Sequence, residues 1–194
     1  MPRTKEQYEK IRAEKRELIK QTALKLFATK GYAATSINEI ALSAGISKGL
    51  MYNYFDGKES LMQHIWDDLV EEFTLLDANN DGEVTSIEAE NFIDKTFELL
   101  INRREEMKLY YQFSFQPDIL DFLTHKYNAE TAQKRQGFII KYFADKLPIA
   151  DKNNAFFTVL VFLKGLCMVV TYTENIYNVK FLNQYKEHLK TILI

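Results

Sequence analysis

Residues 35–55, TSINEIALSAGISKGLMYNYF, constrain the fold of this chain more than any other segment. Apolar residues such as Ile37 and Ile40 recur at helical spacing, and this first short helix must stop at Gly45. Ser47 is a good N-cap for a second short helix after a turn of only a few residues. Two short helices with a glycine in the turn are typical of a helix-turn-helix, so the segment predicts that motif.

The second helix of such a motif enters the major groove of DNA by its N-terminal residues. Lys48 and Asn53 carry groups that can read base edges, Gly49 allows close approach to the backbone, and nearby hydroxyls and Lys58 can contact phosphates. The predicted DNA-binding residues are Thr35, Ser36, Ser47, Lys48, Gly49, Leu50, Tyr52, Asn53, Tyr54 and Lys58. The alternative for Tyr52, Tyr54 and Phe55 is a place in the core, and it is favoured for Phe55.

Composition and charge agree with a helical protein that meets a polyanion. Seven glycines and three prolines in 194 residues disfavour a β-rich architecture with many tight turns. The first sixty residues hold eleven Lys or Arg against seven Asp or Glu, a net of +4, whereas the whole chain has a net charge of −2. A basic N-terminal part on an acidic body favours nucleic acid as the partner.

A long helix is predicted from Glu6 to Thr29, and Gly31 is predicted to end it.

The N-terminal third resembles the DNA-binding domain of TetR-family transcriptional regulators. The pattern A-x-x-L-F-x-x-x-G-Y-x-x-T-S is met by residues 23–36, I-A-x-x-A-G-I-S-K-G-x-x-Y-x-Y-F by residues 40–55, and K-E-x-L by residues 58–61. The resemblance implies an all-α fold with a helix-turn-helix domain over residues 1–60 and a helical ligand-binding and dimerisation domain over residues 61–194. It also implies a homodimer that reads a palindromic DNA operator, represses transcription and is released by a small-molecule inducer.

Two features of residues 61–194 bear on the expected dimerisation and ligand binding. Residues 155–175 are apolar nearly all round and residues 179–192 are amphipathic, so this pair is predicted to form the dimer interface, although a monomer's own core would look the same. Aromatic residues are dense in the middle of the chain, where they line an inducer pocket or simply fill a core. The predicted pocket residues are Phe97, Tyr110, Tyr111, Phe113, Phe138 and Tyr142.

A further motif lies at residues 77–88, DANNDGEVTSIE, which match the calcium-loop pattern D-x-[DN]-x-[DN]-G-x5-E. With helical patterns on both sides, residues 68–97 resemble a complete EF-hand, and Ca²⁺ or Mg²⁺ is the expected ion. The alternatives are a hydrated acidic loop that caps the next helix and, at the level of function, a calcium sensor. A lone EF-hand is expected to bind weakly, with a Kd on the order of 10⁻⁴ to 10⁻³ M. The predicted metal ligands are Asp77, Asn79, Asp81, Glu83 and Glu88.

Enzymatic chemistry has no support in the sequence. There is no P-loop, G-x-G-x-x-G or H-E-x-x-H motif, and the three histidines and Cys167 share no metal-ligand spacing. We therefore expect a regulator that requires no cofactor.

The charged N-terminus does not fit a signal peptide and no apolar run is expected to cross a bilayer, so a cytoplasmic protein with no membrane partner is predicted.

Overall fold

The computed structural model describes residues 4–74, 83–126, 130–173 and 176–194, and in these ranges the chain is helical and contains no strand. The predicted all-α fold is confirmed. The helices are α1 (Lys5–Lys30), α2 (Ile37–Ser43), α3 (Lys48–Met51), α4 (Lys58–Thr74), α5 (Ser86–Asn102), α6 (Arg104–Ser114), α7 (Pro117–Asp121), the π-helix η1 (Phe122–Lys126), α8 (Glu130–Lys146), α9 (Lys152–Tyr172) and α10 (Val179–Leu193).

The chain forms two compact units. The first contains Met1–Asp68 and Leu109–Tyr127, and the second contains Leu69–Lys108 and Asn128–Ile194. This division differs from the predicted one at residue 60, because a segment from the middle of the chain packs with the N-terminal helices.

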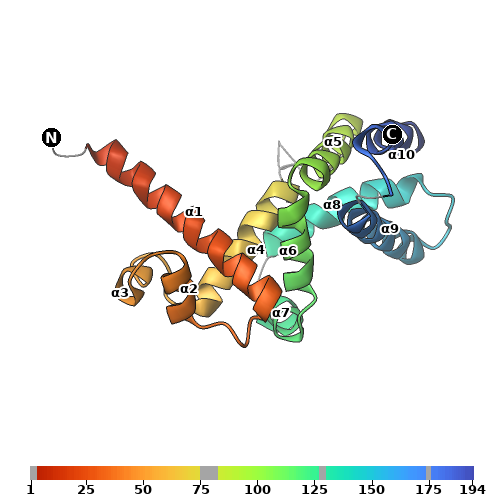
Figure 1. Cartoon of the computed structure of the whole chain (residues 1–194). Coiled ribbons are helices and arrows are strands. Elements are labelled where there is room, and N and C mark those ends of the chain that lie inside the picture. The colour runs from red at the N-terminus through yellow and green to blue at the C-terminus, as the bar shows by residue number, and fades with distance from the viewer. Residues whose placement is uncertain (1–3, 75–82, 127–129, 174–175) are drawn as a thin grey trace. The chain divides into compact units, whose positions relative to one another are not determined.

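The first unit is built on the long helix α1, beside which α2 and α3 lie as a pair of short helices (Figure 1). The helix begins with a capping box between Thr4 and Gln7 and buries Ile19, Ala23 and Phe27. It ends at Gly31, whose φ of 100° is a conformation that favours glycine. The prediction of a helix from residue 6 to residue 29 is therefore confirmed to within a residue at each end.

Residues 109–127 pack with the N-terminal helices in the first unit, and Gln116 and Phe113 are among the residues that make these contacts. The Gln116 side chain donates to the carbonyl of Phe27 at 2.6 Å and accepts from the backbone N–H of Tyr32 at 2.8 Å. The ring of Phe113 stacks on that of Phe27, with centroids 5.7 Å apart. Gln116 thus bonds backbone groups on both sides of the point where α1 ends, and the Phe27 carbonyl also accepts from the N–H of Gly31.

In the second unit α8 packs against α9, and α5 packs against both α9 and α10. Figure 1 shows α5 and α10 side by side. Phe97, Leu100 and Phe143 are fully buried. Asp94 on α5 accepts from Lys186 at 2.9 Å and from Lys190 at 2.7 Å, both on α10, so a pair of ammonium groups joins the two helices.

Helix α9 differs from an ordinary core helix. It is long and apolar enough to cross a membrane by length and composition, contrary to the expectation from the sequence, and only 22% of its most apolar stretch is buried. Between α9 and α10 lies an open groove of about 360 Å³, lined by Phe162, Leu166, Val169, Tyr177, Phe181 and Tyr185 among others. The second unit therefore carries an extended apolar surface.

We predict that Asp94→Asn destabilises the protein only where the carboxylate is charged. Burial alone would raise the pKa of Asp94, but hydrogen bonds from Lys190 and Lys186 outweigh it and hold the pKa below its usual value. A lowered folded-state pKa contributes stability above the unfolded value of about 3.9 and loses it as the pH falls through the folded value. Urea unfolding should show a loss of about 1 kcal/mol or less at pH 7 and none at pH 2. An equal loss at both pH values contradicts the prediction, and Glu98→Gln on the outer face of α5 is the control.

Candidate nucleic-acid interface

The candidate interface is the α2–turn–α3 segment. Ser36 caps α2 by accepting from the N–H of Glu39 at 3.1 Å, and Ser47 caps α3 by accepting from the N–H of Leu50 at 3.1 Å. Gly45 turns the chain between them with a φ of 66°, which is the left-handed conformation that follows many helices. The helix-turn-helix predicted from residues 35–55 is confirmed in its geometry.

Helix α3 presents polar groups outward and apolar groups inward. Lys48, Gly49 and Asn53 are exposed, and the accessible fractions are 49% for Tyr52 and 38% for Leu50. On the inner side Met51 and Phe55 are buried. Phe55 is thus a core residue, as favoured from the sequence, and Tyr54 is half-buried. The exposed set offers an ammonium, an amide and a phenol on α3 and the turn that follows it.

Two arginines of α1 hold the end of this segment, and sequence reasoning missed them. Arg16 donates to the carbonyl of Tyr54 at 3.1 Å, and Arg12 donates to the carbonyl of Asn53 at 3.4 Å. The Arg16 guanidinium also lies over the Phe55 ring, 4.6 Å from its centroid. The signal in the sequence was their spacing of four residues, which places both on one face of a helix.

Two predicted DNA contacts are corrected. Thr35 is buried, and its hydroxyl donates to the carbonyl of Gly31 at 2.8 Å, so it holds the loop before α2. The Lys58 ammonium donates to the carbonyls of Tyr32 at 2.8 Å and Thr35 at 3.1 Å and lies 4.2 Å from the centre of the Tyr32 ring. Both side chains point into the α1–α2 loop because its backbone carbonyls need donors there.

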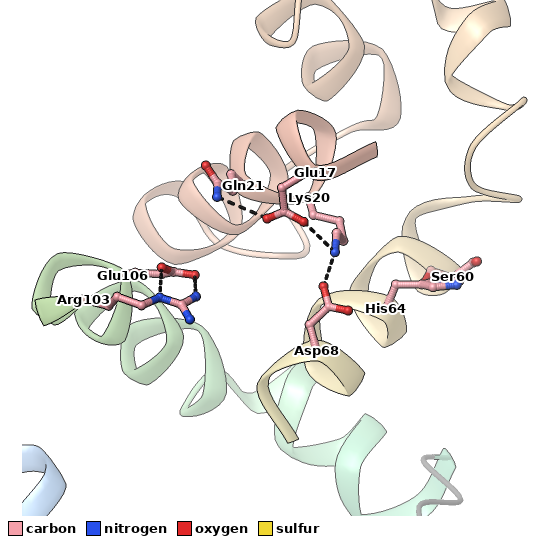
Figure 2. Close-up of polar contacts among 8 residues, drawn as sticks. All are labelled: Glu17, Lys20, Gln21, Ser60, His64, Asp68, Arg103 and Glu106. Carbon is pink, nitrogen blue, oxygen red and sulfur yellow. Dashed lines mark hydrogen bonds and ion pairs between the residues drawn. The ribbon is translucent and has the colours of Figure 1, made fainter. Parts of the chain in front are cut away.

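Helix α4 is tied to α1 by an ion pair in the first unit. Figure 2 shows the Lys20 ammonium between the carboxylates of Glu17 and Asp68, and the Glu17 oxygen lies 2.7 Å away. Burial alone would lower the pKa of Lys20, but the hydrogen bonds with Asp68 and Glu17 raise it above its usual value. Lys20 therefore stays charged and joins α1 to the second half of α4, the helix that follows the helix-turn-helix.

The predicted metal loop is described only in part. Asp77, Asn79 and Asp81 lie outside the described residues. Glu83 is exposed, and the Glu88 carboxylate accepts from the N–H of Thr85 at 2.9 Å as half of a capping box that begins α5. Among the described residues no group of three or more His, Cys, Asp or Glu side chains could hold a metal ion. The contact of Glu88 is the one expected from the helix-capping alternative, and the calcium site stays a prediction.

The six predicted pocket aromatics fall into both units. Tyr110, Tyr111 and Phe113 belong to the first, where Phe113 is fully buried against Phe27. The other three belong to the second unit. There Phe97 is fully buried, Phe138 is half-buried, and the half-buried Tyr142 hydrogen-bonds the Ser86 hydroxyl at 3.1 Å. Phe97 and Phe113 are core residues, and a shared pocket for the set stays a prediction.

Comparison with known proteins shows what the helix-turn-helix segment is similar to. Residues 19–65, which contain α2, α3 and the buried Met51 and Phe55, match the family model for bacterial regulatory proteins of the tetR family. This match covers the helix-turn-helix and its flanking helical residues. The HTH-type transcriptional regulators YuxN and YerO of Bacillus subtilis are 59% and 55% identical to this chain over 49 residues, but the chain covers only 17% of each of them.

Longer similarities extend over the rest of the chain. The icaADBC operon negative transcriptional regulator IcaR of Staphylococcus epidermidis is 25% identical over 150 residues, which are 77% of this chain and 80% of IcaR. The structure of the repressor MexZ of Pseudomonas aeruginosa aligns with a TM-score of 0.62 and 18% identity over 93% of each chain. A TetR-family regulator from Haemophilus influenzae aligns with a TM-score of 0.61 over 93% of this chain and 97% of its own. The whole chain thus has the fold of TetR-type regulators, and the names of these relatives are those of transcriptional regulators.

We predict that Lys58→Ala lowers stability, because it removes the donor from the carbonyls of the α1–α2 loop. Loss of the hydrogen bonds from a charged donor to these part-buried carbonyls costs about 1–3 kcal/mol. Lys48→Ala is the matched control on the exposed side of α3, where a lysine substitution should change stability by less than about 0.5 kcal/mol. Urea unfolding followed by circular dichroism measures both. Equal stability of the two variants would mean that the Lys58 ammonium does not hold the loop.

Proposed function

We propose that this chain is a DNA-binding transcriptional repressor that reads a palindromic operator as a homodimer in the cytoplasm and is released by a small-molecule inducer. The observation that carries the DNA-binding part is the exposure of Lys48, Tyr52 and Asn53 on α3 and the turn after it, which are anchored by Met51 and Phe55. The outward side chains have the donors and acceptors that base edges and phosphates require.

The part of the proposal that concerns repression rests on relatives. IcaR, a negative regulator by name, aligns over most of this chain, and KstR2 of Mycolicibacterium smegmatis, a repressor by name, is 36% identical over 59 residues.

The part of the proposal that concerns an inducer is supported by two buried hydroxyls of the second unit. Thr96 on α5 and Thr171 on α9 are 4% and 0% accessible, and neither hydroxyl has a hydrogen-bond partner among the described residues. A polar ligand that enters the second unit could satisfy them.

The homodimer is supported by the exposed apolar surface of α9 and α10. Phe157, Val161 and Met168 are more than half exposed on α9, and Ile192 is 59% exposed on α10. Helices with such a surface are stabilised when they pack into a bundle with those of a second copy. A dimer would also carry two copies of α3, as a palindromic operator with half-sites about one helical turn apart requires.

We predict that Lys48→Ala and Asn53→Ala reduce discrimination between operators by about tenfold, because each removes a side chain that can read a base edge. The backbone carbonyl of Asn53, which accepts from Arg12, is unaffected by the substitution. A selection of bound genomic fragments with the purified protein defines the operator, and fluorescence anisotropy then compares it with a scrambled duplex at two salt concentrations. Lys95→Ala on α5 is the control.

Two results would contradict this proposal. The first is the absence of sequence preference in the wild-type protein at low salt, which would mean that the chain does not read DNA. The second is that both Lys48→Ala and Asn53→Ala discriminate between the operator and the scrambled duplex as well as the wild type does, which would mean that another surface reads the bases.

We predict that residues 77–88 bind calcium weakly, with a Kd on the order of 10⁻⁴ to 10⁻³ M. Isothermal titration with chelator-treated protein should show heat that Asp77→Ala abolishes, because a carboxylate ligand is lost. Glu83→Gln is a matched control, since this position supplies its backbone carbonyl in the calcium-loop pattern. Operator affinity measured with calcium and with chelator then tests whether the ion affects DNA binding. Equal heats for wild-type and Asp77→Ala would contradict the calcium site.

A further inference from the structure

Gly165 lies at the centre of the exposed apolar face of α9. Phe157, Val161 and Met168 precede or follow it at helical spacing, and their accessible fractions are 65%, 53% and 53%. Tyr172, which is 43% exposed, continues the same face. At 100° per residue these four side chains and Gly165 fall within one quarter of the helix circumference, and the inward face carries buried Ala155, Val159 and Val170 instead.

A side chain at position 165 would be accommodated within the chain itself. A Cβ atom built on Gly165 meets no atom within 4 Å, so packing inside the second unit does not require a glycine here. Glycine is also less favourable than alanine in a helix interior. Packing within one copy of the chain therefore does not explain why position 165, which lies among large exposed apolar side chains, is a glycine.

We propose that Gly165 is the point where α9 crosses α9 of a second copy in the homodimer. Glycine at a helix crossing lets two backbones approach closely, and the flanking large side chains pack on either side of the contact. At a two-fold interface a residue on the axis faces the same residue of the partner, so a position without a side chain is the one that best tolerates this arrangement. The inference rests on the proposed homodimer and names its crossing point.

The chemistry of the face favours a second copy over a charged partner. Between Asn154 and Tyr172 the one charged residue is Lys164, so the surface has no charge pattern that an acidic or basic partner could complement. The same face supplies both projecting rings, such as Phe157, and an empty position at Gly165. The groove between α9 and α10 extends this apolar surface through Phe162 and Phe181, so that the partner's rings have a place to pack.

Sedimentation equilibrium of the full chain tests the crossing point. Gly165→Leu should weaken the dimer by at least about tenfold, because a branched side chain separates the two backbones. Gly165→Ala should weaken it to a smaller extent although it favours the helix. Gly137→Leu is the matched control: this glycine also lies inside a helix, α8, with no atom within 4 Å of a built Cβ, and its dimer should dissociate like the wild type. Circular dichroism checks that each variant is folded.

The outcomes separate the crossing point from the proposed function. If Val161→Glu dissociates the wild-type dimer but Gly165→Leu leaves it intact, Gly165 is not the crossing point, although α9 still forms part of the dimer interface. A wild-type dimer that neither substitution affects overturns both. A wild-type protein that is monomeric in solution contradicts the homodimer itself. A vesicle flotation assay then shows whether the monomer binds phosphatidylglycerol vesicles or remains unbound. Dissociation by Gly165→Leu and Val161→Glu, with Gly137→Leu unchanged, supports the proposal.

Discussion

Helix α3, for which we propose a role in reading DNA, depends on contacts with other parts of the first unit. Helix α3 has only four residues, fewer than an isolated helix needs to be stable in water. Its conformation is maintained by the burial of Met51 and Phe55 and by the hydrogen bonds from Arg12 and Arg16 to the carbonyls that follow it. A short element that is fixed on its inner side and at its end can expose every other side chain, which is what recognition of base edges requires.

Sequence patterns predicted the elements whose cause is local. The turn at Gly45 and the end of α1 at Gly31 follow from glycine at positions of positive φ, and the last helix, predicted over residues 179–192, is found at Val179–Leu193. The roles of Thr35 and Lys58 could not be predicted in this way. Both residue types are common at DNA interfaces, and only the folded loop shows that its carbonyls bind them first.

The division into units illustrates the same limit. The break near Pro117 was predicted, but the sequence contains no local signal that the segment around it belongs with α1. That assignment depends on Gln116, whose amide bonds Phe27 and Tyr32 across more than eighty residues of chain. A glutamine in a polar stretch looks like a surface residue until its partners are known. For the same reason the candidate pocket could not be separated from the core: aromatic spacing does not distinguish Phe113, which packs on Phe27, from a ligand contact.

The contribution of a charged side chain in the first unit to the electrostatic field depends on whether an opposite charge is paired with it. Lys20 and Lys30 are paired with Asp68 and Glu39, so they add little to the field that DNA would meet. Arg12 and Arg16 donate to neutral carbonyls beside the end of α3, and a guanidinium bonded to a carbonyl keeps its full charge. Arg12 and Arg16 therefore add positive charge beside the end of α3, although the chain as a whole has a net charge of −2. In the proposed function, these two charges would attract phosphates to the end of α3, whereas residues 61–194 carry an excess of carboxylates that would repel them.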